Sequence, residues 1–399
     1  MPDRRLQLIL FFATTALIAA AGGIHDATFN NYLRDAFDLS PGVRGALEFP
    51  RELPGLVVVL MTGVLSMLSV TGLGIVGAAV FCLGAVGLAC TTSYGGMVSM
   101  MILGSAGMHL LQPVGGSIAL GLSDPDNRGR RMGQAGAVGA VGMIIGTGAV
   151  WWLFDKEAPQ YQAAFLGIAA LTLAAGVIYA FMRIPHLRQS KAHFVIRRKF
   201  TLYYILELLF GARKQIFITF GPWVLIQVYG EPANAIAGLL MIAAIIGIVF
   251  KPLAGVAIDR FGERTVMILD GLTLAVVCLG YGYALRLFGS AERALPVAAA
   301  CFILDNLLFS LGASRAVYMA RLAESSEEVT STLAMGVSVN HIASMIIPAI
   351  AGVAWVWLGY EMLFLAAAGL ALIISAVACW APPRAHWLAS DPAEAPVGP

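Results

Sequence analysis

Charged side chains are scarce in this sequence. Asp, Glu, Lys and Arg make up 12% of its 399 residues, whereas they make up about 25% of an ordinary soluble domain. Hydrophobic residues account for 59%, and the mean hydropathy is +0.82. Apolar runs of about 20 residues or more recur along the chain, and each is long enough to cross a bilayer as a helix. The composition excludes a soluble globular protein and predicts an all-α polytopic membrane protein embedded in the lipid bilayer.

The motifs of soluble chemistry are also lacking. The five cysteines all lie in apolar segments and form no CxxC pair, so we expect neither disulfides nor a metal site. No phosphate-binding glycine loop is present, which argues against ATP-driven transport. A net charge of +2 provides no field suited to nucleic acid. We therefore expect no enzyme activity, no cofactor and no nucleic-acid partner. The first apolar run has no convincing cleavage site, so we expect it to be a retained helix.

The apolar runs predict twelve transmembrane spans. Their approximate ranges are 6–35, 44–69, 72–92, 96–121, 132–154, 160–183, 200–229, 233–257, 265–288, 294–320, 328–357 and 360–381. The most polar break, at 184–199, is rich in Lys and Arg and divides the spans into six and six. We expect one six-helix bundle in 1–183, a basic cytoplasmic linker in 184–199, a second bundle in 200–381 and a disordered cytoplasmic tail in 382–399.

Lys and Arg counts predict the orientation of the chain. With the N-terminus inside, 15 of the 25 Lys and Arg residues fall on the cytoplasmic side and five on the outer side. Cytoplasmic loops carry the excess of basic residues in membrane proteins. We therefore expect a multi-pass protein of the cytoplasmic (inner) membrane, with both termini in the cytoplasm.

Four predicted spans carry their most polar residues at a similar depth. At a rise of about 1.5 Å per residue, these residues lie roughly 17–20 Å from the start of their spans. They are His109, Arg213, Lys214, Asp305, Asn340 and His341. This depth is the middle of a ~30 Å hydrocarbon core. A Lys or Arg there costs about 2.5–3.5 kcal/mol, so such residues are expected to face protein or a central cavity.

The paired cations Arg213 and Lys214 have two interpretations. They either bind an anionic substrate in the cavity or form a charge-neutral lock with Glu207 or Asp305. Adjacent residues on a helix diverge by about 100°, so one cation can bind substrate while the other is tied to an acid. Arg315 is expected to reach toward the inner membrane surface.

A second polar layer lies toward the outer ends of the first two spans. Glu48, Arg51 and Glu52 share one helix face at spacings of three and four residues. Asp26 of the first span is placed to pair with Arg51. The layer is either an outer ion-pair gate or structural network, or a direct contact for substrate. His109 is either a hydrogen-bonded packing residue or a proton carrier, because histidine titrates near neutral pH.

Two loop sequences resemble a known family. The stretch Gly255-Val-Ala-Ile-Asp259-Arg260-Phe-Gly262-Glu-Arg264 resembles the signature loop of the major facilitator superfamily, and Asn127-Arg-Gly-Arg-Arg-Met-Gly133 is similar to another of its loops. The resemblance implies two pseudo-symmetric six-helix bundles, alternating access and a functional monomer. It also implies a cytoplasmic gate at the first loop. His109-Leu-Leu-Gln112 departs from the RxxQ of proton-coupled members, which puts their coupling scheme in doubt here.

These observations together predict a secondary active transporter of a small, anionic organic solute, coupled to protons as a symporter. The alternatives are a proton-coupled exporter of amphipathic compounds and a non-transporting receptor of the same fold. The substrate-binding candidates are Arg213, Lys214, Arg51, Asn30, Gln112, Gln215, Asn340 and His341. The proton-coupling and ion-pair candidates are Asp26, His109, Glu207, Asp305, Glu48 and Glu52. The cytoplasmic-gate candidates are Gly255, Asp259, Arg260, Gly262 and Arg264.

Overall fold

A computed structural model describes residues 4–60, 67–123, 127–184 and 196–383. Within these ranges every regular element is a helix. The chain forms two compact units. Unit 1 comprises Met1–Ala192 with Leu225–Ile248, and unit 2 comprises His193–Val224 with Val249–Pro399. The predicted division into 1–183, 184–199, 200–381 and 382–399 remains a prediction. Residues 185–195 and 384–399 lie outside the described part.

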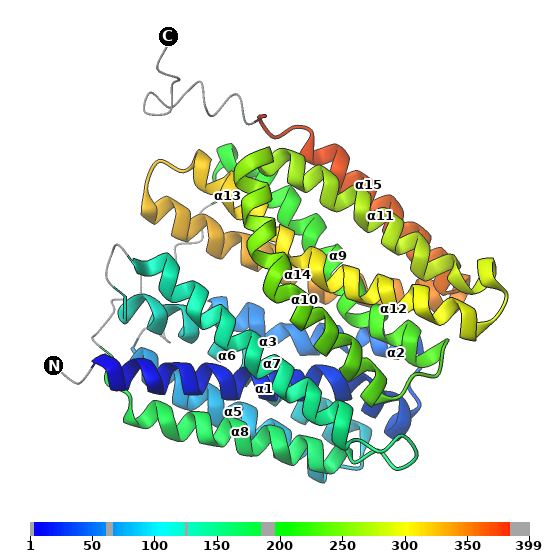
Figure 1. The fold of residues 1–399 in the computed structure, drawn as a ribbon, viewed down its shortest axis with the longest axis horizontal. Helices are drawn as coiled ribbons and strands as arrows, with labels where there is room; N and C mark the ends of the chain where they lie inside the picture. Colours follow the sequence, from blue (N-terminus) through cyan, green and yellow to red (C-terminus); the bar gives the residue numbers. More distant parts are fainter. Residues whose placement is uncertain (1–3, 61–66, 124–126, 185–195, 384–399) are drawn as a thin grey trace. The chain divides into compact units, whose positions relative to one another are not determined.

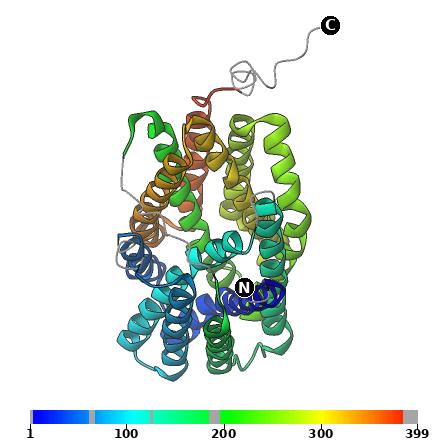
Figure 2. The ribbon, with the colours of Figure 1, turned by 90° about the vertical axis from the view of Figure 1, so that its left-hand side faces the viewer.

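Unit 1 is built from the N-terminal helices. They are α1 (Arg4–Phe37), α2 (Pro41–Ala46), α3 (Glu48–Leu60), α5 (Val70–Cys90), α6 (Tyr94–Gly121), α7 (Arg128–Leu153) and α8 (Tyr161–Phe181), and the first part of α10 (Ala233–Phe261) joins them. Helix α1 packs against α7 and α8, and α5 packs between α6 and α8 (Figure 1). The same bundle is seen end-on in Figure 2, with α1 in dark blue.

Glycines allow α1 and α7 to approach closely. A Cβ added at Gly142 would lie 2.4 Å from the carbonyl oxygen of Ala16, and one at Gly146 would lie 2.1 Å from that of Ala20. Neither position has room for a side chain. Small residues spaced four apart are typical of such helix contacts in membranes, and the two glycines occur at this spacing.

Unit 2 is built from the C-terminal helices. They are α9 (Thr201–Gln227, through Val224), the rest of α10, α11 (Glu263–Phe288), α12 (Ala291–Leu308), α13 (Ala313–Leu322), α14 (Ser326–Leu358) and α15 (Tyr360–Ala378). Helices α11 and α15 lie side by side (Figure 1). The Ser375 hydroxyl donates to the Ile268 carbonyl at 2.9 Å across this contact.

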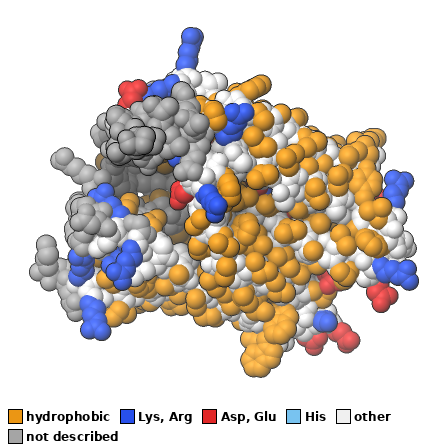
Figure 3. Space-filling model, turned by 45° about the horizontal axis from the view of Figure 1, so that its top comes forward, with side chains coloured by type: hydrophobic (Ala, Val, Ile, Leu, Met, Phe, Trp, Pro, Cys, Tyr) orange, Lys and Arg blue, Asp and Glu red, His pale blue; other side chains and the backbone are white. Residues whose placement is uncertain are grey.

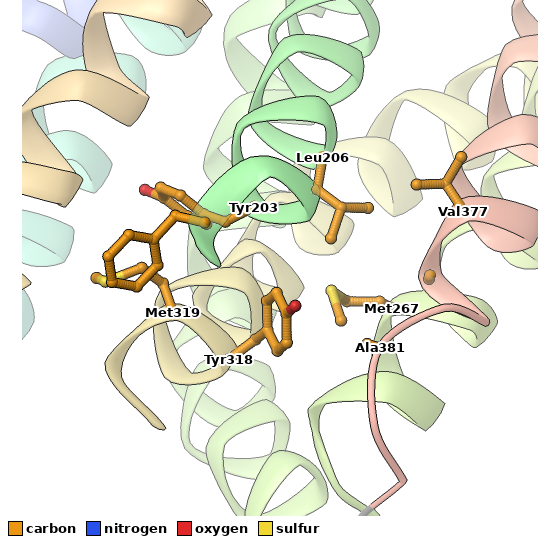
Figure 4. Packing of buried hydrophobic residues seen from close by; sticks show 9 residues of the cluster. Tyr203, Leu206, Met267, Tyr318, Met319, Val377 and Ala381 are labelled. Carbon is orange, nitrogen blue, oxygen red and sulfur yellow. The ribbon is translucent and has the colours of Figure 1, made fainter. Parts of the chain in front are cut away.

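An apolar cluster fixes one end of unit 2. Tyr203 and Leu206 of α9 meet Met267 of α11, Tyr318 of α13 and Val377 of α15 (Figure 4). All five side chains are buried. The contact joins four helices on the N-terminal side of Arg213 and Lys214 of α9. It therefore holds the start of α9 in place relative to its neighbours.

The structure confirms the predicted all-α fold. Eleven of the twelve predicted spans coincide with one helix or with a broken helix, the tenth being divided at a 3-10 turn, η3 (Phe309–Gly312), into α12 and α13. The second predicted span, 44–69, begins as α2 and α3, which are separated at Leu47, and its residues 61–66 lie outside the described part. Ten described segments are long and apolar enough to cross a membrane. Helix α9 is not among them, and Arg213-Lys214-Gln215 within it lowers its hydropathy.

The surface agrees with a membrane protein. Hydrophobic side chains cover much of the face seen in Figure 3, and most of the Lys and Arg side chains in this view lie toward its left and right edges. Large apolar side chains of α10 are exposed, including Ile245, Val249 and Leu253. Helices that expose such residues are suited to contact with lipid.

Candidate functional site

Unit 1 contains a buried network of four charged residues. Arg44 of α2 donates to Glu48 Oε1 at 2.5 Å, and Arg51 donates through Nε to Glu48 Oε2 at 2.7 Å. The Arg51 guanidinium also lies 3.1 Å from Glu52 Oε1. Glu48 is fully buried, and Arg44 is nearly so. The formal charges of the two cations and the two acids balance, and each oxygen of Glu48 accepts a hydrogen bond from an arginine.

The start of α2 and the neighbouring α1 hold Arg44 in this network. Ser40 caps α2 and Pro41 occupies its first turn, as is favoured at helix N-termini. The Asn30 side chain of α1 accepts from Arg44 Nε at 2.9 Å. Arg44 was counted only as an outer cation from the sequence, because nothing in the sequence shows that α1 meets it.

His109 lies at the edge of the same network. Its Nδ1 is 2.9 Å from the Ser105 carbonyl oxygen, and its Nε2 is 3.9 Å from Glu52 Oε2. The Ser105 hydroxyl donates to the Arg51 carbonyl at 2.5 Å. A carbonyl oxygen only accepts, so Nδ1 carries a proton and Nε2 is directed toward Glu52.

Two predicted residues of unit 1 lie at the margin of this network. Asp26 is exposed and 3.4 Å from His25 Nδ1. It acts on Arg51 through its charge, whereas the direct ion-pair partners of Arg51 are Glu48 and Glu52. Gln112 is exposed although His109 is buried, so the two side chains of the predicted pair have different surroundings.

In unit 2, α9 faces the broken tenth span through three successive pairs. Glu207 accepts from Arg315 Nε at 2.9 Å, and the Phe210 ring packs edge-on against Phe309 at 6.1 Å. The third pair is Arg213 with Asp305. The order reverses along the tenth span because the two elements run antiparallel. Arg315 is thus buried and paired, whereas the sequence suggested a side chain extended to the membrane surface.

Arg213 is the most deeply buried cation of this group. Its Nη2 lies 3.2 Å from Asp305 Oδ1 and 4.0 Å from Asp270 Oδ1. The side chain is 2% exposed, and none of its three nitrogens has a hydrogen-bond partner among the described residues. The guanidinium instead lies over the rings of Phe309, at 4.6 Å, and Phe210, at 5.6 Å.

Asp270 was missed by the sequence reasoning. It is a buried acid on α11 that shares Arg213 with Asp305, and its Oδ1 has no hydrogen-bond partner in the described chain. A signal was available. Asp270 is the sole charged residue between Arg264 and Arg286, in an otherwise apolar span, and such residues are functional candidates by default.

Lys214 points in another direction from Arg213. Its ammonium donates to Asn340 Oδ1 of α14 at 2.8 Å. The contact depends on Gly211, where an added Cβ would lie 2.7 Å from the Asn340 carbonyl oxygen. Gln215 and His341, both predicted to bind substrate, are buried within unit 2. The structure therefore brings Lys214 and Asn340 together and pairs Arg213 with acids.

The predicted gate residues form the junction between α10 and α11. Gly262 has φ 83° and ψ 153°, a conformation that suits glycine, and it alone separates the two helices. Gly255, Asp259 and Arg260 are exposed, and Arg264 is partly buried. Glu263, which directly follows Gly262, is buried and lies 3.5 Å from Arg321 of α13.

A last ion-pair group holds the start of α14. The Glu328 carboxylate accepts from Arg197, from Lys199 at 2.8 Å and from the Glu324 backbone N–H at 2.8 Å. Ser325 caps the helix by accepting from the Glu328 N–H, as is favoured at helix N-termini. The hydrogen bond from Lys199 is the main cause that lowers the pKa of Glu328 to about 2.

Comparisons with known proteins identify the fold. A family model described as Major Facilitator Superfamily matches residues 8–314 and 203–398. Nucleoside transporter NupG has a similar structure, with a TM-score of 0.73, 16% identity and coverage of 95% of this chain and 98% of NupG. The D-xylose-proton symporter is similar to this chain with a TM-score of 0.73 at 14% identity, and the match covers 95% of this chain and 98% of the symporter.

A third similar structure is a bacterial homologue of the human lysosomal transporter Spinster. Its TM-score is 0.70 at 15% identity, and the match covers 96% of this chain and 97% of that protein. No curated protein sequence matches the chain. Identities this low establish a shared fold and do not transfer a substrate.

Proposed function

Because the chain belongs to the Major Facilitator Superfamily, a family of secondary transporters, we propose that it carries a small organic solute with an anionic group across the cytoplasmic membrane together with a proton. The direction we propose is import. Proton symport offsets the cost of bringing an anion into a compartment of negative potential. The similarity in fold to a D-xylose-proton symporter is compatible with this coupling.

Lys214 carries the proposal as the anion-binding residue. Its ammonium donates to Asn340 Oδ1 of α14. The adjacent cation, Arg213, is held by two acids, Asp305 and Asp270. In this proposal Lys214, and not Arg213, attracts the carboxylate or phosphate of the solute. Asn340, Gln215 and His341 supply orienting hydrogen bonds in this proposal.

The charged residues of unit 1 have a structural role in this proposal. Glu48 and Glu52 both lie within ion-pair distance of Arg51, and Asn30 accepts from Arg44. These groups fix the second predicted span against α1 and α6. His109, whose Nε2 is directed toward Glu52, is the residue of this network placed to respond to protons.

We further propose that 1–183 and 200–381 rock against each other around the solute, in a monomer with both termini in the cytoplasm. Asp259 and Arg260 then act at the cytoplasmic gate, where Gly262 makes the sharp connection between α10 and α11.

A thermal-shift screen tests the anion assignment. Purified protein is mixed with small organic anions, cations and neutral solutes at two pH values, using wild type, Lys214→Ala and the control Lys251→Ala. Lys251 is an exposed cation of α10. Stabilisation by an anion that is lost in Lys214→Ala and kept in Lys251→Ala supports the proposal. Stabilisation only by amphipathic cations, unchanged in Lys214→Ala, contradicts it and favours an exporter.

A further inference from the structure

Residues 225–248 belong to a different unit from the chain on either side of them. They pack as part of unit 1, whereas the preceding part of α9 and the following part of α10 belong to unit 2. The segment comprises the end of α9, the connection at 228–232 and the first part of α10. It is therefore a helical hairpin that is continuous with unit 2 in sequence but packs with unit 1.

Two side chains of α1 hold this hairpin through its backbone carbonyl groups. Asn31 Nδ2 donates to the Glu231 carbonyl oxygen at 2.9 Å, and Arg34 Nη1 donates to that of Ile226 at 3.0 Å. Ile226 lies in the last turn of α9, where carbonyl groups lack partners within the helix and attract a cation. Arg34 is itself held by Asp35, which accepts from its Nε at 2.6 Å. The donors of α1 are thus fixed in position to bind the hairpin.

The same hairpin packs closely on α7. A Cβ added at Gly238 of α10 would lie 3.0 Å from Trp151 Cδ1 of α7. One added at Gly148 of α7 would lie 3.5 Å from Met241 Sδ of α10. The two helices therefore meet at two successive levels, and the side chains at both levels are apolar.

Both boundaries of the hairpin lie close to a proline. The boundary in α9, after Val224, follows Pro222, and the boundary in α10, after Ile248, precedes Pro252. Each proline lies inside its helix. A proline there lacks the N–H that bonds to the carbonyl four residues earlier, and helices bend at such positions. The hairpin is therefore placed to move about the two prolines.

Two polar contacts of α9 and its connection are suited to movement. Asn31 is fully buried, but its Oδ1 has no hydrogen-bond partner in the described chain, so water can satisfy that oxygen once the hairpin leaves. In the middle of α9, Arg213 lies 3.2 Å from Asp305 without a hydrogen bond to the described residues. The attraction between charges falls only as the inverse of their distance, so it persists through a small displacement.

We infer that residues 225–248 are a flap on the outer side of the transporter, latched to α1 by Asn31 and Arg34. The flap lies on α1 and α7 while the outer side is closed. It moves away about Pro222 and Pro252 when that side opens, and α9 passes the movement to the group around Arg213. The inference rests on the proposed function for the orientation and the transport cycle, whereas the latch itself needs no solute.

Pulsed electron paramagnetic resonance of the purified protein tests the latch without any solute. One spin label replaces Gln227 on the flap and the other replaces Glu157 between α7 and α8, both of which are exposed. The exposed Cys90 and Cys379 are changed to serine. Wild type should give one distance between the labels, which is that of the latched flap.

Arg34→Gln removes the charged donor of the latch. We expect the population of a second, longer distance to rise about tenfold, because a hydrogen bond from a charged group is lost. Asn31→Asp replaces a donor by an acceptor that faces the Glu231 carbonyl oxygen, so it acts in the same direction. The matched control is Arg286→Gln, which removes an exposed arginine at the end of α11 and keeps the wild-type distance.

An unchanged distance distribution in Arg34→Gln overturns the latch, and so does an equal change in Arg286→Gln. The Arg34 side chain is 24% exposed, so Arg34→Gln remains a test of the latch even if Asn31→Asp does not fold. If the flap opens as expected but no anion stabilises the protein in the thermal-shift screen, the flap stands and the anion proposal fails.

Discussion

The two units bury charge in opposite ways. In unit 1, Glu48 accepts from Arg44 at 2.5 Å and from Arg51 at 2.7 Å, and the two arginines are matched by two acids. In unit 2, Arg213 lies among Asp305, Asp270 and two aromatic rings without a hydrogen bond to described residues. Short hydrogen bonds fix a charge in one arrangement, whereas charges held by proximity can redistribute when an ion arrives.

This difference distinguishes a structural network in unit 1 from the group around Arg213 in unit 2, to which we assign a part in transport. A balanced, hydrogen-bonded network such as that of Arg44, Glu48 and Arg51 gains nothing from a further ion. The group around Arg213 has two acids for one cation, so it is not balanced in this way. The predictions below test whether the unit 1 network is structural and the unit 2 group is exchangeable.

The largest effect is expected for Glu48→Gln. Glu48 is fully buried and is shared by Arg44 and Arg51. Its loss leaves Arg44 and Arg51 with one remaining acid, Glu52, which pairs with Arg51. The buried Arg44 then faces a neutral amide, which costs about 3–5 kcal/mol of stability. Thermal unfolding of the purified protein measures the loss, with the exposed Glu292→Gln as control. An equal midpoint for the two variants would show that the network does not stabilise unit 1.

A smaller loss is expected for Asn30→Ala. Asn30 accepts from Arg44 Nε at 2.9 Å across the α1–α2 contact. Removing this buried acceptor costs about 1–3 kcal/mol. Asn306→Ala is the control, because the Asn306 side chain donates to the Phe302 carbonyl of its own helix and so joins no second helix through that bond. If Asn306→Ala lowers the unfolding midpoint as much as Asn30→Ala does, the hydrogen bond between Arg44 and Asn30 does not have the structural role that we assign to it.

A still smaller effect, visible only in acid, is expected at Glu328. The Glu328 carboxylate, like that of Glu48, accepts from two cations, which are Arg197 and Lys199. Glu328 lies at the polar start of α14. Its pKa is lowered from 4.5 to about 2. A lowered pKa adds stability that is present above the unfolded value and is lost as pH falls toward the folded one.

The midpoint of thermal unfolding should therefore fall between pH 4.5 and about 2 in wild type and fall less steeply in Glu328→Gln. Glu324→Gln is the matched control, because Glu324 is highly exposed and pairs with the same Lys199 at 3.0 Å. Parallel acid profiles for wild type and Glu328→Gln would contradict the assignment.

The fold was largely predictable, because long apolar runs are a direct signal of membrane helices. The span predicted at 265–288 is α11, Glu263–Phe288, in the structure. The break at Phe309–Gly312 was not predicted. It lies between Asp305 and Arg315, and both side chains face α9. Hydropathy detects that a segment is apolar but not how its backbone bends to direct two side chains at one neighbour.

The pairing within the candidate site was predictable in part. The sequence offered a lock of Arg213 or Lys214 with Glu207 or Asp305, and Arg213 does lie beside Asp305, whereas Glu207 pairs with Arg315. The contact of Lys214 with Asn340 was not predicted. Which face of each helix meets which neighbour depends on tertiary packing, so Asp270 was overlooked. The position of Asn30 against Arg44 was missed for the same reason.

The most direct test of the contrast between the two units is the thermal unfolding midpoint of Asp270→Asn beside that of Glu48→Gln, in the same detergent at neutral pH. Asp270→Asn leaves Arg213 and Asp305 as a balanced pair, so we expect a loss below about 1 kcal/mol, the smallest of the series. Glu48→Gln should lose several times more. A loss in Asp270→Asn as large as that in Glu48→Gln would contradict the account, because Asp270 would then be as fixed a partner as Glu48.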